Sequence, residues 1–223
     1  MTQLSATALA CRRGDRLVFT GLDLTLRSGG ALIAVGANGS GKSSLLRLLA
    51  GLLAPFAGVI AWDGVPVTRD THAHRRRVAY LGHADAVKPA LTVAEDIRFW
   101  TALDGGSRQA GDAALAAMGL APLAELSCRH LSAGQKRRLA LARVLARIDA
   151  PLWILDEPTN GLDSEARRRL ARALAAHRDG GGMVVAATHE DLALPGAVTL
   201  DLSPFAVEAR AADVRGLEVD RVV

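Results

Sequence analysis

The segment Gly36-Ala-Asn-Gly-Ser-Gly-Lys-Ser43 constrains the fold of this chain more than any other feature. It matches the pattern G-x-x-x-x-G-K-[ST], in which glycines let successive backbone N–H groups turn inward around phosphate oxygens. The apolar run Ala31–Val35 before it predicts a buried strand, and the leucines after it predict a helix over Ser43–Leu53. This order of strand, glycine loop and helix predicts a phosphate-binding site in an α/β fold.

The residues of this loop have distinct expected roles. The positive end of the helix dipole faces the anion, Lys42 reaches the β- and γ-phosphates, and the Ser43 hydroxyl ligates Mg²⁺. An ordinary glycine-rich turn is the alternative, and the strand and helix on either side argue against it. The residues expected to bind the nucleotide are Gly36, Ala37, Asn38, Gly39, Ser40, Gly41, Lys42, Ser43 and Ser44.

A second apolar run, Leu152–Leu155, is followed by two carboxylates, Asp156 and Glu157. Ligands of open α/β sheets bind at the carboxyl ends of the strands. Alone, such a pair is usually a solvated strand end, but a phosphate loop in the same chain favours a catalytic role. Asp156 is then expected to hold Mg²⁺ through water, and Glu157 to orient or deprotonate the attacking water.

Strand and helix signals divide the chain into two kinds of region. From Thr92 to about Ile148 the pattern is helical and rich in alanine and leucine, and Thr92 with Glu95 forms a capping-box start. Outside it, strands are predicted at Val59–Trp62, Val78–Leu81 and Met183–Ala187, and a helix at Ser164–His177. These patterns predict a mostly parallel sheet in an α/β core of residues 1–86 and 150–223, interrupted by a helical subdomain of residues 87–149.

Composition narrows the classes of function. The chain has 223 residues, of which 50% are hydrophobic, and its net charge is +4. Aromatic residues make up only 4%, which leaves few stacking platforms for single-stranded nucleic acid. The uncharged run Leu48–Trp62 is too short to span a bilayer. Two cysteines fit a reducing compartment. We therefore expect one domain that is soluble, or peripheral to a membrane through a partner, and that does not bind nucleic acid.

The segment Leu131-Ser-Ala-Gly-Gln135 resembles the signature Leu-Ser-Gly-Gly-Gln of the ATP-binding subunits of ABC transporters, except at Ala133. Without the resemblance it would be only a helix cap. The resemblance implies a P-loop ATPase core of RecA type, with an antiparallel β subdomain and an inserted helical subdomain. In that family the signature acts on the nucleotide of a second copy. Ser132, Gly134 and Gln135 are thus expected to contact ATP–Mg²⁺ held by the sister subunit of a dimer.

Further segments extend the resemblance. Asn160-Gly-Leu-Asp163 matches the family's D-loop, which implies a nucleotide-interface role for Asp163. His189 follows a strand where the family has a histidine that bonds the γ-phosphate. His83 stands in place of the family's Q-loop glutamine, which implies a role near Mg²⁺ and the attacking water. Arg13 takes the place of the usual aromatic residue, and its guanidinium is expected to stack on adenine. The implied catalytic residues are Glu157, His189, Lys42 and His83, and the implied metal ligands are Ser43, Asp156 and His83.

One subgroup is resembled in particular, the ATPase subunits of cytochrome c maturation transporters, also called heme exporters. The features are Leu81–Ala84, Lys88–Val93, Ile97–Trp100 and Ala150–Leu155. They imply ATP hydrolysis coupled to a permease of the CcmB type and its associated maturation proteins, at the cytoplasmic face of the bacterial inner membrane. The alternatives are an ATPase for another small cargo, a non-transport ABC ATPase acting on DNA or ribosomes, and a nucleotide-binding scaffold without turnover.

Overall fold

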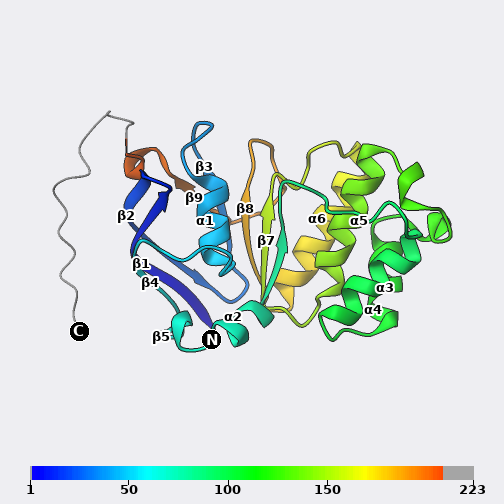
Figure 1. Cartoon of the computed structure of the whole chain (residues 1–223), viewed down its shortest axis with the longest axis horizontal. Coiled ribbons are helices and arrows are strands. Elements are labelled where there is room, and N and C mark those ends of the chain that lie inside the picture. The colour runs from blue at the N-terminus through cyan, green and yellow to red at the C-terminus, as the bar shows by residue number, and fades with distance from the viewer. Residues whose placement is uncertain (1, 208–223) are drawn as a thin grey trace.

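A computed structural model describes residues 2–207 of the chain, so the last predicted core residues, 208–223, lie outside the described part. Two sheets form its centre (Figure 1). The parallel sheet has the strand order β6-β7-β8-β3-β9 and contains β6 (Val78–Leu81), β7 (Leu152–Asp156), β8 (Met183–Ala187), β3 (Ala31–Val35) and β9 (Val198–Asp201). The antiparallel sheet has the order β2-β1-β4-β5 and contains β2 (Arg16–Arg27), β1 (Gln3–Arg13), β4 (Ala57–Trp62) and β5 (Val65–Pro66).

Helices cover the parallel sheet, and some of them form a separate group at one side of it. They are α1 (Lys42–Leu49), α2 (Thr71–Arg76), α3 (Val93–Leu103), α4 (Arg108–Ala117), α5 (Ala133–Ala146) and α6 (Ser164–Asp179). In Figure 1 the antiparallel strands lie at the left, the parallel sheet in the middle, and α3, α4 and α5 at the right. The prediction of an α/β fold with an antiparallel β subdomain and helices inserted between β6 and β7 is confirmed. Within residues 2–207 no helix is both long and apolar enough to cross a membrane.

The central strand β7 is buried along its whole length because it is covered on both faces. Leu152 and Ile154 belong to the hydrophobic cluster of α1 and the antiparallel sheet. Trp153 and Leu155 belong to the opposite cluster, which α5 and α6 complete. Successive side chains of a strand point to opposite faces, so an unbroken apolar run is what a doubly covered strand requires.

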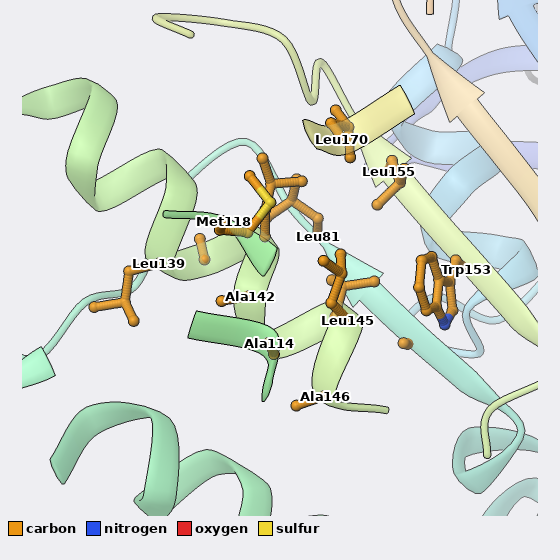
Figure 2. Close-up of a cluster of buried hydrophobic side chains, with 14 of the residues drawn as sticks. Leu81, Ala114, Met118, Leu139, Ala142, Leu145, Ala146, Trp153, Leu155 and Leu170 are labelled. Carbon is orange, nitrogen blue, oxygen red and sulfur yellow. The ribbon is translucent and has the colours of Figure 1, made fainter. Parts of the chain in front are cut away.

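The helical region packs onto the sheet through α5. Figure 2 shows Leu145 of α5 close to Leu81 of β6 and to Trp153 of β7, with Met118 from the end of α4 nearby. All of these side chains are buried. The predicted division into a core of residues 1–86 and 150–223 and a helical subdomain of residues 87–149 stays a prediction, and this shared cluster joins its two parts.

Helix ends explain where the expected and observed elements differ. The capping box of Thr92 and Glu95 is confirmed, with both hydrogen bonds present. The helix predicted over Ser43–Leu53 ends at Leu49, because Gly51 adopts a left-handed φ of 67° that stops the α-helical hydrogen bonds. The region predicted to be helical after Thr92, with breaks at Gly105-Gly106 and Pro122, contains the α-helices α3, α4 and α5, and α3 ends before the left-handed Gly105.

Candidate nucleotide site

A cavity of about 720 Å³ lies where the phosphate loop meets the carboxyl end of β7. That volume is in the range of small-molecule sites, roughly 300–1,000 Å³. Its lining includes eleven of the predicted site residues: Arg13, Asn38, Gly39, Gly41, Lys42, Ser43, Ser44, His83, Asp156, Glu157 and His189. Asn160 of the predicted D-loop lines it as well. Strands far apart in the sequence therefore bring the predicted phosphate loop, carboxylates and strand-end histidine to one place.

The phosphate loop depends on glycine at Gly36 and Gly41. Their φ angles are 140° and 103°, a region that side chains rarely adopt. A Cβ at Gly41 would lie 2.8 Å from Val18, and one at Gly36 would lie 2.8 Å from the Ser40 hydroxyl. The loop is thus held tightly against its surroundings, with the first turn of α1 directly behind it.

The Lys42 side chain is folded over its own loop. Its Nζ donates hydrogen bonds to the carbonyl oxygens of Gly36 at 2.7 Å and Ala37 at 3.2 Å. Lys42 is only 8% exposed, so this charge is largely withdrawn from bulk water. A buried ammonium at a helix N-terminus is a strong attraction for a polyphosphate.

Asp156 and Ser43 form a pair that fits a magnesium ion. The Ser43 hydroxyl donates to Asp156 Oδ1 at 3.1 Å. The other carboxylate oxygen, Oδ2, is buried and has no hydrogen-bond partner among the described residues. A buried carboxylate oxygen without a partner is costly, and a hard cation compensates that cost. Mg²⁺ favours a site of this kind, one or two oxygen ligands from the protein with phosphates supplying others.

Glu157 directly follows Asp156 at the end of β7 and lies next to the end of β8. Its backbone N–H donates to the carbonyl of Ala187 at 2.8 Å, and its φ of 49° is left-handed. The Glu157 Oε1 atom lies 3.6 Å from Nε2 of His189, whose side chain is 55% exposed. The side chain of Glu157 is 19% exposed, so the carboxylate meets the cavity from a largely enclosed position.

The basic rim of the cavity comes from the antiparallel sheet. Arg13 at the end of β1 and Arg16 at the start of β2 both line it. The residues pair directly across the hairpin. Arg13 therefore lies where it can approach a base, and its stacking on adenine stays a prediction. Sequence reasoning missed Arg16, Arg47 and Glu190, which also line the cavity.

The signature residues lie outside this cavity's lining and satisfy one another. Ser132 Oγ accepts from Gln135 N at 3.2 Å, and Ser132 N donates to Gln135 Oε1 at 2.8 Å, which makes a complete capping box for α5. Asp163 accepts from Ala166 N at 2.7 Å and caps α6. The structure thus separates Ser132, Gly134, Gln135 and Asp163 from the phosphate loop of the same chain.

A buried arginine that sequence reasoning missed joins these regions. Arg137, on α5, donates through Nη2 to the carbonyl oxygens of Asp156 at 2.6 Å and Glu157 at 2.7 Å. Its Nη1 donates to the carbonyl of Gly82 at 3.1 Å and to Asp85 Oδ1 at 2.8 Å. The available signal was a charged residue at the helical spacing of the buried Leu141 and Val144.

Comparison with known proteins agrees with this arrangement. The family model described as "ABC transporter" matches residues 19–160. A "Cytochrome c biogenesis ATP-binding export protein CcmA" from Paramagnetospirillum magneticum is 56% identical over 207 residues, covering 91% of this chain and 95% of that protein. A protein of the same name from Rhodospirillum rubrum is 53% identical, covering 92% of this chain and 88% of its own length.

Two solved structures share the fold. A putative ABC transporter ATP-binding protein from Pyrococcus furiosus has a TM-score of 0.79 at 23% identity, covering 92% of this chain and 100% of that one. A bacterial Atm1-family ABC exporter with ATP bound has a TM-score of 0.78 at 22% identity, covering 89% of this chain and 37% of that one. By its matched residues and its relatives, the chain belongs to the ABC transporter family, as an ATP-binding subunit of the cytochrome c biogenesis export type.

Proposed function

We propose that this chain hydrolyses ATP as one of two identical copies and thereby drives a transporter that serves c-type cytochrome biogenesis. The observation that carries the proposal is the single cavity shared by Lys42, the Ser43–Asp156 pair, Glu157 and His189. That set supplies a cation for the phosphates, ligands for Mg²⁺, a carboxylate for water and a hydrogen-bonding imidazole.

The residues of the cavity have separable roles in this reaction. The loop amides and Lys42 bind the β- and γ-phosphates. Ser43 and Asp156 would hold Mg²⁺, which neutralises charge on the phosphate oxygens when bound. Glu157 accepts a hydrogen bond from the attacking water through its carboxylate and takes its proton, and His189 donates a hydrogen bond to the γ-phosphate.

The site of one copy is completed by the signature of the other. Ser132, Gly134 and Gln135 lie outside the cavity of their own chain, at the N-terminus of α5, where backbone N–H groups favour an anion. Two ATP–Mg²⁺ would then be enclosed between two copies, with Asp163 near the same interface. Closure of the pair excludes water and assembles the site, and hydrolysis opens it.

The closing and opening of the dimer is transmitted to a membrane-embedded permease, which by resemblance is of the CcmB type. A groove of about 450 Å³ between the sheet and the helical region begins next to His83 and offers a place for it. Apolar side chains such as Leu52 and Trp100 line this groove together with the paired charges of Asp104 and Arg147. The chain would then lie peripherally at the cytoplasmic face of the inner membrane and support heme delivery to c-type cytochromes.

The decisive test is Glu157→Gln in the chain assembled with its permease. We expect ATP binding to persist while turnover falls by about two to four orders of magnitude, because the carboxylate that accepts the water's proton is gone. Glu165→Gln is the matched control, since Glu165 lies on α6 with its side chain 47% exposed and pairs with Arg168 and Arg169. Phosphate release near the wild-type rate in Glu157→Gln would remove Glu157 from this role.

The partner is tested separately by detergent extraction and affinity purification from the native host. Copurification of the cytochrome c maturation permease is the expected result. Recovery of a different permease would assign the ATPase to another small cargo, without changing the chemistry of the site.

A further inference from the structure

The guanidinium of Arg137 joins three segments that are distant in sequence. Its four hydrogen bonds reach Gly82 and Asp85 in the loop after β6, and Asp156 and Glu157 at the end of β7, while its own backbone belongs to α5. The side chain is 5% exposed. Both terminal nitrogens are paired, whereas the Nε atom is buried without a hydrogen-bond partner among residues 2–207. Charge-assisted bonds from the two terminal nitrogens therefore hold all three segments to one arrangement.

The bonds to β7 fix the backbone on both sides of Glu157. The carbonyls of Asp156 and Glu157 belong to the peptide groups that precede and follow the Glu157 Cα atom, and both accept from the same Nη2 atom. The Glu157 φ of 49° is unfavourable for a residue with a side chain. The direction in which the carboxylate leaves the chain depends on that φ, and Arg137 helps to hold it.

The bonds to the loop after β6 flank His83. Gly82 and Asp85 stand on either side of this histidine, which lines the nucleotide cavity. A second arginine of α5, Arg143, donates to the carbonyl of Asp85 at 2.8 Å and pairs with the fully buried Asp96 of α3. The His83 loop is therefore fastened to α5 at two points, and α5 is fastened to the rest of the helical region.

We propose that Arg137 is a positioning residue of the ATPase reaction. It sets the orientation of Glu157 and the placement of the His83 loop together, so that a displacement of α5 changes both at once. The signature residues begin this same helix. A second copy's nucleotide could displace α5 by binding at the signature, and the permease could do so by binding in the neighbouring groove. Either displacement would thereby change the orientation of the Glu157 carboxylate, which acts on water. This inference rests on the role of Glu157 proposed above.

The test compares Arg137→Gln with Arg138→Gln in the complex with the permease. Arg138 is the next residue of α5, and it contacts the carbonyl of Met118 at 3.3 Å rather than the nucleotide site. We expect Arg137→Gln to lower kcat for ATP by about 10- to 100-fold, as a misplaced catalytic group does. The KM for ATP and the affinity for a fluorescent ATP analogue should stay within about threefold, because the phosphate loop is untouched.

A double variant separates positioning from a general loss of structure. If Arg137 acts chiefly through Glu157, the two losses should not multiply, and the residual kcat of Arg137→Gln/Glu157→Gln should lie far closer to that of Glu157→Gln alone than to the product of the two single effects. Arg137→Lys should recover only part of the rate, since an ammonium cannot reach all four acceptors. Should Arg137→Gln fail to fold, Asp85→Asn replaces it, and a kcat decrease of about threefold is expected because the arginine loses its only carboxylate partner on the loop.

Three outcomes would overturn the proposal: a kcat for Arg137→Gln equal to that of Arg138→Gln, a parallel loss of ATP affinity, or an unchanged kcat in Asp85→Asn. Failure of the proposed function would look different. In that case Glu157→Gln itself would hydrolyse ATP normally, whatever Arg137→Gln did.

Discussion

The nucleotide cavity and the signature segment treat their polar groups in opposite ways. In the cavity, Asp156 Oδ2 is buried without a hydrogen-bond partner among residues 2–207, and so is the Ser40 hydroxyl of the adjoining phosphate loop. At the signature, Ser132 and Gln135 satisfy each other in a capping box. The nucleotide cavity is therefore incomplete until a ligand arrives, whereas the signature is a stable helix start that a ligand of another copy can approach without rearrangement.

Ser132→Arg tests whether the signature segment faces a second copy, and its expected effect on turnover is the largest. A long cationic side chain at the start of α5 should block the approach of a second copy while leaving the cavity of its own chain intact. We expect ATP binding by the monomer to be unchanged and ATP-driven dimerisation to be lost, with turnover in the complex down by about 100-fold or more. Light scattering with and without ATP, in a Glu157→Gln background, measures the dimer.

Ser132→Ala is the matched control, because it removes the cap without adding bulk. It should lower stability by about 1 kcal/mol and still allow pairing. Unchanged dimerisation of Ser132→Arg would mean that the signature does not face a second copy.

A smaller effect concerns the basic rim. Arg13→Ala should weaken ATP binding by about 3- to 10-fold, the range of a partly exposed cation–π contact. Arg12→Ala is the control, since Arg12 lies 4.6 Å from the ring centroid of Phe56 and is not among the residues that line the cavity. The contribution of adenine is measured by comparing the equilibrium affinities of each variant for ATP and for inorganic triphosphate. An equal loss for both ligands would show that Arg13 acts on phosphate charge and not on adenine.

The smallest expected effect is a pH dependence of folding stability, which comes from His74 at the end of the phosphate-loop helix α1. Buried His74 accepts from Trp62 Nε1 at 2.9 Å and lies 3.0 Å from the carbonyl of Leu49 at the end of α1, so Nε2 is the protonated nitrogen. Burial lowers the His74 pKa from 6.5 despite that hydrogen bond, with Arg77 and Arg75 adding to the decrease. The folded state therefore binds fewer protons, and stability should be fully present above pH 6.5 and decline as the pH falls below it.

Urea unfolding at a series of pH values across 6.5 measures this decline. His177, whose pKa burial also lowers, contributes in the same direction. His74→Gln should be less stable at high pH and less sensitive to acid. If the free energy of unfolding falls with decreasing pH equally in the wild-type chain and in His74→Gln, the decline belongs to other groups.

Sequence alone predicted the elements whose chemistry is local. Met183–Ala187 has the predicted bounds because its five apolar residues, bounded by Gly182 and Thr188, fit a short strand that is buried on both faces. The phosphate loop could be predicted because its glycines and lysine act within eight residues. Arg137 could not, since its four acceptors lie 19 to 55 residues away in sequence and only the fold brings them together. The early end of α1 depends on Gly51, whose left-handed φ is not specified by the leucine spacing.

The close contact between Gly134 and Gly161 has a consequence for how two sites would communicate. A Cβ at Gly134 would lie 2.7 Å from the carbonyl oxygen of Gly161, so the start of α5 and the turn after Glu157 touch through bare backbone. In the proposed dimer, the surface that senses the neighbour's ATP is thus in direct contact with the turn that follows the chain's own Glu157. Each subunit would then read the occupancy of its sister before acting on its own nucleotide, and a methyl group at Gly134 should uncouple the two.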